Sequence, residues 1–342
     1  MRKGSRRLRV LTWHVHGNYL WYLSQTPHDF YVPFKPGRPH PYGGRAGTFP
    51  WPDNLHELPA NEVRRRDFDC VVFQAKRNYL QDQHDILSEA QRRLPRIFVE
   101  LDPPLEHPFA QPHVVNDREI LLVHVAHWNA LMWDARATPT RVIEEGVIVP
   151  DDVRYTGELP RGITAINHLR GRGRRMGADL FSVARERVPI DLVGMDAESL
   201  GGLGEIDPPR LAKVQARYRF WFSPIRQTSL QLAILEAMMV GLPIVGFQTG
   251  ELASVIENGV NGVLDLSLDR LVDVMQQLIH DPVEAARLGA GARRTARERF
   301  SIERFTSEWD ATLTEMAGRR RPSTRALRAG ASSASSIREA QA

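Results

Sequence analysis

The chain has 342 residues but a single cysteine, so no disulfide can form within it. This residue, Cys70, lies in the apolar run CVVF and is expected to be a buried thiol in a β-strand. Such a position is unsuited to a catalytic nucleophile, which must be accessible and activated. The cysteine content therefore argues against a disulfide-built module and against thiol catalysis, and it fits a reducing cytoplasm.

Long apolar runs are missing from the sequence as well. No stretch of eighteen apolar residues occurs, so a membrane-spanning helix is not expected. The basic N-terminus leads into a strand-like segment of mixed polarity rather than the apolar core of a signal peptide. We therefore expect a cytoplasmic protein.

Several signature motifs of ligand binding and catalysis are absent. No GxGxxG follows the first predicted strand, no GxxxxGK(S/T) phosphate loop occurs, and no GxSxG elbow marks a hydrolase. Two histidine pairs, His14/His16 and His124/His127, have the spacing of metal ligands, but neither has a carboxylate in a settled arrangement beside it. We interpret them as hydrogen-bonding histidines of a cleft and expect no metal site.

Lysine is scarce, at four residues, and the formal net charge of +4 belongs to the two ends of the chain. Residues 1–10 carry five basic residues and no acid, and residues 318–342 carry six arginines and one glutamate, which leaves the segment between them at −6. We favour solvated tails and expect no nucleic-acid partner. Peripheral contact of the tails with anionic headgroups at the inner membrane face stays open.

Short β-branched segments alternate with helix-like segments in both halves of the chain. The predicted strands lie within 8–17, 69–74, 96–101, 120–125, 140–147, 162–167, 190–195, 219–224, 243–247 and 262–266. The predicted helices cover 19–24, 79–94, 177–187, a segment starting at 228, 267–279, 283–299 and 302–317. Residues 27–59, dense in Pro, Gly, His and aromatic residues, are expected to form a long functional loop. The alternation predicts an α/β fold of two Rossmann-like domains with parallel sheets.

Two segments that follow predicted strands suit a phosphorylated ligand, because ligands of open parallel sheets bind beyond the carboxyl ends of the strands. Residues 169–177, LRGRGRRMG, interleave four arginines with glycines, and arginine forks bind phosphate oxygens. Thr228 and Gln231 have the T-x-x-Q spacing of a capping box, which predicts a helix start with free amides at Ser229, Leu230 and Gln231. For residues 169–177 the alternative is an exposed basic loop without a ligand. The two segments together favour a nucleotide diphosphate as the ligand.

The segment LQLAILEAMMVGLPIVGFQTGELASVIENGVNGVL, residues 230–264, resembles the donor-binding segment of a known family. The family is that of the retaining glycosyltransferases of GT-B fold, family-4-like (glycosyl transferases group 1). Its members typically read E-x7-E, then A-M-x-x-G-x-P-V-V, then G-G-x-x-E-x-I and N-G-x-x-G. IDLVGM and FWFSP resemble its upstream strands, and DPVEAARLGAGARRTARERFSIERF is similar to its C-terminal helices. The resemblance is specific over residues 162–313 and weak over the first half.

The resemblance implies two Rossmann-like domains that face a central cleft. Residues 1–152 would bind the acceptor, 153–300 would bind the nucleotide sugar, and 301–317 would form a helix that crosses back to the first domain. The basic tail, 318–342, would be disordered. The implied substrates are a nucleotide-sugar donor and a sugar, lipid-linked or small-molecule acceptor. No metal or other cofactor is implied, because cationic side chains and a helix N-terminus stabilise the departing diphosphate.

The resemblance also assigns roles to individual residues. Glu236 matches the second glutamate of the E-x7-E pair and would bind the ribose hydroxyls. The basic pair that holds the diphosphate is matched most nearly by Arg174 and Arg175, assisted by the amides of Ser229 and Leu230. The glycine-containing acceptor loop of the family falls on His14, Gly17 and Asn18.

The sequence departs from the family pattern at three places. Thr228 stands where the first glutamate of the pair would contact the donor sugar. Gly250-Glu251 replaces a glycine pair, so Glu251 is a candidate to supply a carboxylate to the donor. Leu101 occupies the position of a histidine that the family often has in its first domain. Glu100 and Asp102, which flank Leu101, are therefore the catalytic candidates, and His107 lies near them.

These features lead to three hypotheses of function. The first is a metal-independent, retaining glycosyltransferase that acts in glycan, polysaccharide or glycoconjugate biosynthesis. The second is a catalytically impaired nucleotide-sugar-binding protein of the same fold, which the substituted histidine and glutamate would explain. The third is a GT-B-type sugar epimerase, to which no particular sequence feature points.

Overall fold

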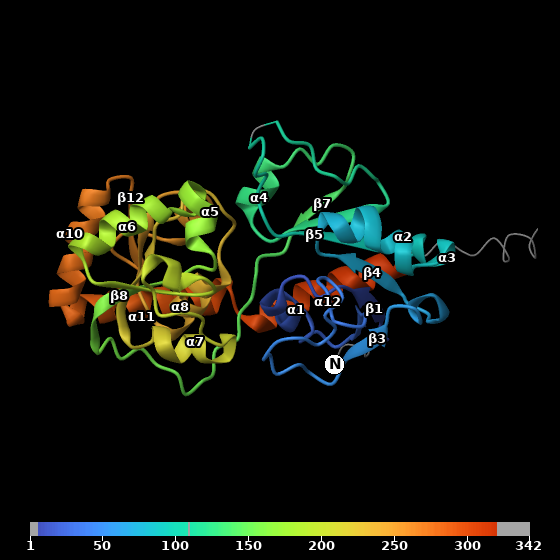
Figure 1. Cartoon of the computed structure of the whole chain (residues 1–342), viewed down its shortest axis with the longest axis horizontal. Coiled ribbons are helices and arrows are strands. Elements are labelled where there is room, and N and C mark those ends of the chain that lie inside the picture. Colours follow the sequence, from blue (N-terminus) through green and yellow to red (C-terminus); the bar gives the residue numbers. More distant parts are fainter. Residues whose placement is uncertain (1–5, 109, 320–342) are drawn as a thin grey trace, which may run out of the picture.

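The computed structural model describes residues 6–108 and 110–319 of the chain. It contains two parallel β-sheets, of seven and five strands, each with helices packed against it (Figure 1). Strands β1 to β7 build the larger sheet and β8 to β12 the smaller one, so each sheet comes from one continuous part of the chain. The expected α/β fold with two sheet-containing domains is confirmed.

The seven-stranded sheet has the order β3-β2-β1-β4-β5-β6-β7, and its neighbouring strands are parallel. Its strands are β1 (Arg9–Thr12), β2 (Asp29–Phe34), β3 (Leu55–Pro59), β4 (Cys70–Phe73), β5 (Arg96–Glu100), β6 (Ile120–His124) and β7 (Thr140–Val142). All residues of β4 and β6 are buried. Burial on both faces explains their unbroken apolar sequences, which made these strands predictable.

The prediction of one long loop over residues 27–59 is wrong, because this region contains β2 and β3. Phe30 and Val32 of β2 are fully buried in the core, while Pro33 and the flanking prolines weaken the strand signal in the sequence. A loop is present only between the two strands, over residues 35–54.

The helices of the first domain are short. They are α1 (Gly17–Leu23), the 3-10 turn η1 (Val63–Arg65), the π-helical turn η2 (Asn78–Asp82), α2 (Gln83–Ile86), α3 (Glu89–Arg92) and α4 (His127–Met132). The single helix expected over 79–94 is interrupted at Leu87, whose backbone is extended. Ser88 and Gln91 then form a capping box that starts α3 anew.

The five-stranded sheet has the order β12-β11-β10-β8-β9 and is parallel throughout. Its strands are β8 (Leu159–Ala165), β9 (Ile190–Val193), β10 (Tyr218–Ser223), β11 (Ile244–Phe247) and β12 (Gly262–Asp265). The associated helices are α5 (Leu169–Met176), α6 (Ala178–Arg187), the 3-10 turn η3 (Ala197–Leu200), α7 (Pro208–Gln215), α8 (Leu232–Val240), α9 (Leu252–Val255), α10 (Leu268–His280) and α11 (Pro282–Arg299). Each of these strands overlaps a predicted strand, whereas the helices α5, α7 and α9 were not predicted.

Helix α8 does not begin at Thr228, so the predicted capping box is wrong. The helix starts at Leu232 after the extended Gln231, and no side chain in the described part of the chain caps it. Residues 228–231 form a loop instead, in which Leu230 is buried in the apolar core. The helix ends at Gly241, which has the positive φ of 98° that a helix C-terminus favours in glycine.

The last helix, α12 (Ile302–Gly318), runs back across the first domain (Figure 1). It packs against α1 and β4, with Phe305, Trp309 and Leu313 fully buried. A single cluster of buried apolar side chains contains residues of both domains. Within the described ranges, no helix combines the length and the apolar character needed to cross a membrane. The expected basic tail, apart from Gly318 and Arg319, lies outside the described residues.

Candidate functional site

Both sheets reverse their strand order at an interior position, and such a position is where ligands of open parallel sheets bind. In the first sheet the reversal lies between β1 and β4, and in the second between β8 and β10. The segments that leave the carboxyl ends of β1, β4, β8 and β10 are residues 13–16, 74–77, 166–168 and 224–231. A ligand site is therefore expected among the described side chains around these segments.

Glu236 is held at the boundary between the two domains. It lies on α8 of the second domain, and its Oε1 accepts a hydrogen bond of 2.7 Å from the hydroxyl of Tyr22 on α1 of the first domain. The side chain is only 5% exposed, and Oε2 has no hydrogen-bond partner among the described residues. Burial raises the pKa of Glu236 to about 7, although the hydrogen bonds from Tyr22 and Asn18 lower it. This carboxylate is not a solvated helix residue, and one of its oxygens is free to accept from a ligand.

A second carboxyl group, Glu145, is close to Glu236 and was not predicted from the sequence. Glu145 is buried, and its Oε2 has no partner in the part of the chain that the structure describes. Burial raises the pKa of Glu145 well above its usual range, and the charges of Glu236 and Asp102 raise it further. The strand predicted over 140–147 ends at Val142, so Glu145 lies beyond the carboxyl end of β7. Two carboxyl groups thus share one poorly solvated region.

Asp102, a catalytic candidate, lies in an interdomain group of charges. Burial lowers the pKa of His16, and the nearby Asp102 opposes that shift. Arg172 of the second domain interacts with the same Asp102, and its pKa is lowered by burial and by Arg175. His16, at the start of α1, was considered only as a metal ligand, and Arg172 only as one arginine of a basic segment. The structure brings both of them to Asp102.

The arginines of residues 169–177 point in different directions. The segment is a helix, α5, broken at Gly173, where φ is 58° and ψ is −141°. The exposed Arg174 pairs with Asp179 at 2.7 Å, and Asp179 also pairs with Arg226. Arg175 instead lies against the loop before α8, where its Nη1 donates to the carbonyl of Gln227 at 3.4 Å. Of the predicted pair, Arg175 is therefore near the loop of the candidate site and Arg174 is engaged elsewhere.

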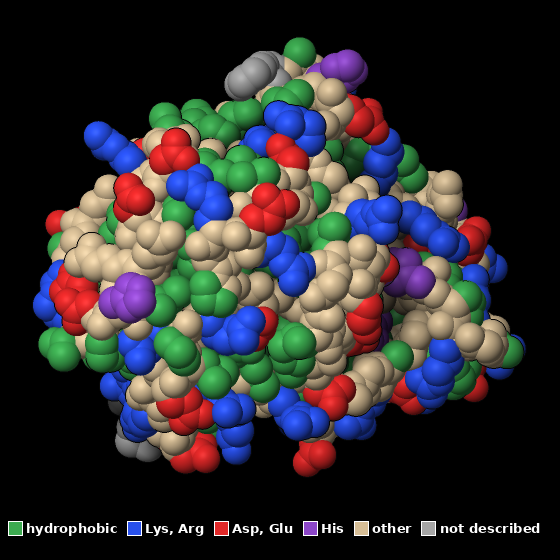
Figure 2. Space-filling model, turned by 60° about the vertical axis from the view of Figure 1, so that its left-hand side comes forward, with side chains coloured by type: hydrophobic (Ala, Val, Ile, Leu, Met, Phe, Trp, Pro, Cys, Tyr) green, Lys and Arg blue, Asp and Glu red, His purple; other side chains and the backbone are tan. Residues whose placement is uncertain are grey.

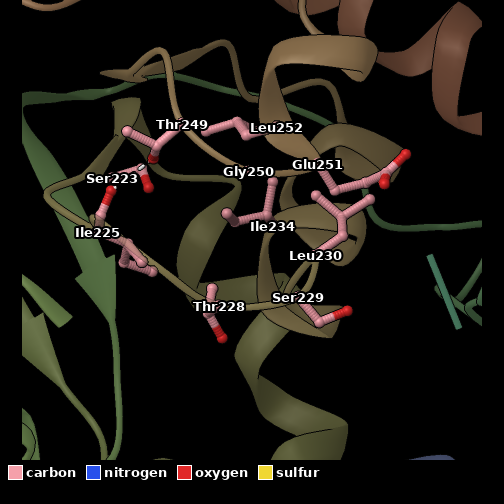
Figure 3. Close-up of a pocket in the computed structure, with 10 residues that line it drawn as sticks. All are labelled: Ser223, Ile225, Thr228, Ser229, Leu230, Ile234, Thr249, Gly250, Glu251 and Leu252. Carbon is pink, nitrogen blue, oxygen red and sulfur yellow. Dashed lines mark hydrogen bonds between the residues drawn. The ribbon is translucent and has the colours of Figure 1, made fainter. Parts of the chain in front are cut away.

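A small pocket lies between the loop before α8 and the loop after β11 (Figure 3). Its lining brings together Thr228, Ser229, Leu230, Gly250 and Glu251, all of which were predicted donor-binding residues. The full lining is Ser223, Ile225, Thr228, Ser229, Leu230, Ile234, Thr249, Gly250, Glu251 and Leu252. Gly250 has a φ of 55°, and a Cβ there would lie 3.2 Å from the Thr228 carbonyl oxygen. The positive φ favours glycine at this position, and the close approach of the two loops leaves little room for a side chain.

The carboxylate of Glu251 is directed away from the other lining residues (Figure 3) and is already satisfied. Its Oε2 accepts from the backbone N–H of Trp128 in the first domain at 2.6 Å, and its Oε1 accepts from Ser254 Oγ at 2.7 Å. Arg299 bridges Oε1 of Glu251, at 3.2 Å, to Glu144 of the first domain, at 2.5 Å. In this structure Glu251 therefore joins the two domains rather than lining an open carboxylate site.

Glu100, the other catalytic candidate, is also engaged within the first domain. Its Oε2 lies 3.0 Å from His113 Nε2, and its Oε1 accepts from the backbone N–H of Asp102 at 3.1 Å. His113 in turn packs edge-on against Trp133. Glu100 thus orients the turn that carries Asp102.

The three predicted acceptor residues lie together at the start of α1. The Nδ1 of His14 lies 2.7 Å from the Gly44 carbonyl, and burial lowers the pKa of His14. A Cβ on Gly17 would overlap the ring of Phe49, so the loop after β2 covers this end of the helix. Asn18, on α1 like Tyr22, lies near Glu236 and lowers the pKa of that carboxyl group. A half-buried aromatic group, formed by Trp21, Phe49 and Trp51, lines the same loop.

Metal binding finds no support in the side chains of residues 6–108 and 110–319, among which no group of three or more His, Cys, Asp or Glu could hold an ion. Cys70 is buried, and burial raises its pKa to about 12, as expected for a structural thiol. Figure 2 shows basic and acidic side chains interspersed on the visible face, without a broad patch of one sign. That face lacks the basic stripe typical of nucleic-acid binding.

Residues 182–281 match the family model described as Glycosyl transferases group 1. No curated protein matches the chain in sequence. Known structures match over most of the chain. Sucrose-phosphate synthase from Thermosynechococcus elongatus has a TM-score of 0.68 at 14% identity, and the match covers 92% of this chain and 100% of the synthase chain. HepE from Anabaena in complex with UDP has a TM-score of 0.61 at 15% identity, covering 90% and 100%.

A mutant of S. aureus TarM, in complex with Fondaparinux, alpha-GlcNAc-glycerol and UDP, has a TM-score of 0.55 at 14% identity. It covers 75% of this chain, which spans 58% of the TarM chain. At these identities the likeness shows the fold alone. The resemblance to group 1 glycosyltransferases is thus confirmed for part of the second domain by the family model, and for the two-domain architecture by the fold. The individual site residues stay predictions.

Proposed function

We propose that this protein is a glycosyltransferase that moves a sugar from a UDP-sugar to an acceptor hydroxyl, with retention of configuration and without a metal. The observation that carries the proposal is the buried carboxylate of Glu236, which has one unpartnered oxygen and lies on the helix behind the pocket-forming loops. The group 1 match covers this helix, and the Anabaena neighbour is a complex with UDP.

The donor would lie across the second domain. The unpartnered Oε2 of Glu236 accepts from a ribose hydroxyl, while the amides of Ser229 and Leu230 and the guanidinium groups of Arg172 and Arg175 hold the diphosphate. Burial is the main cause that lowers the pKa of Arg172, and the charge of the nearby Arg175 lowers it further. A diphosphate would supply the negative charge that two neighbouring, partly buried guanidinium groups favour.

The acceptor would enter from the first domain, beside His14, Gly17 and the aromatic group of Trp21, Phe49 and Trp51. Aromatic faces suit the apolar faces of sugar rings. In the transfer, the bond between the anomeric carbon and the diphosphate oxygen breaks while the acceptor oxygen bonds to that carbon on the same face. The acceptor proton passes to the departing phosphate oxygen, whose charge the arginines and amides stabilise.

Binding without turnover is the competing function, and specific observations favour it. Thr228 supplies no carboxylate to the pocket, Glu251 is engaged with Trp128 and Arg299, and Glu100 is engaged with His113. The two functions differ in one measurable property, the release of UDP in the presence of an acceptor.

The experiment has a binding arm and a turnover arm. Calorimetry with UDP and a panel of UDP-sugars is expected to show binding in EDTA, weakened about 10- to 100-fold in R175Q because a charge-assisted hydrogen bond is lost. R174Q is the matched control and is expected to bind like the parent. Release of UDP with a sugar and lipid-linked acceptor panel then distinguishes transfer from binding alone. Absence of any nucleotide-sugar binding by the parent protein contradicts both functions.

A further inference from the structure

Trp128 belongs to the first domain but lies against the pocket of the second. It is on α4, and its backbone N–H donates to Glu251 Oε2 at 2.6 Å. Glu251 is also held by Arg299, which pairs with Glu144 of the first domain. Two connections therefore tie the pocket loop to the first domain, and the first of them fixes the position of Trp128.

The indole of Trp128 lies next to Gly250, which lines this pocket. Its Cδ1 and Nε1 both lie 3.8 Å from the place where a Cβ on Gly250 would be. The indole N–H is buried and has no hydrogen-bond partner in the described ranges of the chain. The indole N–H groups of Trp13, Trp221 and Trp309 are also unpaired among the described residues, but these side chains lie in the apolar core. Trp128 differs from them because its indole lies beside a residue of the pocket lining, where a ligand could supply the acceptor.

A second unpaired group lies on the opposite loop. Ser229 is 8% exposed, lines the same pocket, and its Oγ has no partner among the residues that the structure describes. Ser229 and Gly250 belong to the two loops that approach each other at the pocket (Figure 3). One unpaired polar atom thus lies in the pocket lining and another next to it, and they come from different domains.

The lining indicates which part of a ligand belongs here. It includes the hydroxyl side chains Ser223, Thr228, Ser229 and Thr249, and it contains no lysine or arginine. Its one carboxylate, Glu251, is already satisfied. The side chains of this lining are suited to a neutral group rich in hydroxyls, whereas the proposed phosphate contacts are backbone amides of the loop and arginines of α5.

We propose that Trp128 contacts the sugar of the donor and that its indole N–H donates to a sugar oxygen, so that the first domain takes part in the choice of sugar. The inference rests on the proposed function. Ser229 Oγ shares the same sugar from the second domain. The sugar therefore binds fully only when α4 is docked on the pocket loop, whereas the nucleotide does not depend on this contact.

The test compares UDP with UDP-glucose by calorimetry in the full chain. W128F keeps an aromatic ring and the backbone bond to Glu251 but removes the indole N–H. It is expected to weaken UDP-glucose binding about 5- to 10-fold, the loss of one neutral hydrogen bond, and to leave UDP binding unchanged. W221F is the matched control. Trp221 is fully buried on β10, and this variant is expected to bind both ligands like the parent.

Each outcome decides the inference. Equal affinity of W128F and the parent for UDP-glucose overturns the role of Trp128 and leaves the proposed function intact. An equal loss for UDP and UDP-glucose also overturns it, because the contact would then be to the nucleotide or to the loop as a whole. Failure of the parent to bind either ligand overturns the donor site itself and the inference with it. A thermal unfolding curve like that of the parent shows that W128F is folded.

Discussion

Replacing Glu236 by glutamine is expected to stabilise the protein at alkaline pH while it impairs donor binding. The carboxyl group is buried, and its pKa is raised from 4.5 to about 7 by desolvation. A pKa change of this size corresponds to roughly 3 kcal/mol of unfolding free energy, at about 1.36 kcal/mol per pKa unit. Glutamine keeps the shape and an oxygen that can accept from Tyr22, but it carries no charge.

The direction in which Glu236 changes the stability with pH follows from proton binding. Between pH 4.5 and about 7 the folded protein keeps the Glu236 proton, whereas the unfolded chain loses it. The folded state then binds more protons, so the contribution of this group to stability falls as the pH rises through that window. The loss is complete above about pH 7. E236Q lacks this titration, so its advantage over the parent is expected to be near zero below pH 4.5 and to grow to about 3 kcal/mol by pH 8.

The assay is urea unfolding of parent and E236Q at half-unit steps from pH 4.5 to pH 8.5. E62Q, which removes an exposed carboxylate of the same domain as Tyr22, is the control and is expected to follow the parent. Calorimetry with UDP completes the experiment, because the proposed ribose contact is lost in E236Q. If E236Q and the parent keep a constant difference in stability across this range, Glu236 does not titrate as its burial implies and the reasoning is refuted.

Two further variants test the connections between the domains. Y22F removes the hydroxyl that donates to Glu236, and we expect the free energy of unfolding, measured in urea, to fall by about 2 kcal/mol at pH 8, where the carboxylate is charged, and by about 1 kcal/mol at pH 5. Equal losses at both pH values would show that this hydrogen bond is insensitive to the charge of Glu236. R299Q leaves the carboxylate of Glu251, which is 2% exposed, without its cation and is expected to lower the free energy of unfolding by roughly 3 kcal/mol, whereas R287Q, from an exposed pair on the same helix, should lower it by less than about 1 kcal/mol. Similar melting temperatures for the two variants would contradict this role of Arg299.

Most strands of the two sheets, all except β2 and β3, were predictable because parallel strands buried on two faces have unbroken apolar sequences, as in CVVF at β4 and ILLVH at β6. The exceptions have local causes. Prolines obscure β2, a capping box at Ser88 divides one expected helix, and burial of Leu230 replaces the first turn of another by a loop. Short helices such as α4 and α9 carry too few residues to show a period.

The site was less accessible to sequence reasoning than the fold. Glu236 was found because a motif surrounds it, but its partner Tyr22 is 214 positions away in the sequence. Glu145 and Arg172 stand out only when burial brings them to other charges, which no spacing along the chain encodes. The glutamates inside the predicted strand 140–147, in VIEEGV, are the one sequence signal at Glu145, because a strand buried on both faces does not favour charged residues.

The lone thiol in the middle of the first sheet makes this chain a convenient object for spectroscopy. Cys70 is fully buried and its pKa is about 12, so maleimide reagents at neutral pH will leave it unlabelled. New cysteines at Leu131 and Leu203, which are 75% and 63% exposed on the first and second domain, would accept a fluorophore pair without any background mutation. Energy transfer between the two fluorophores would report in real time on the distance between the two domains when a nucleotide binds.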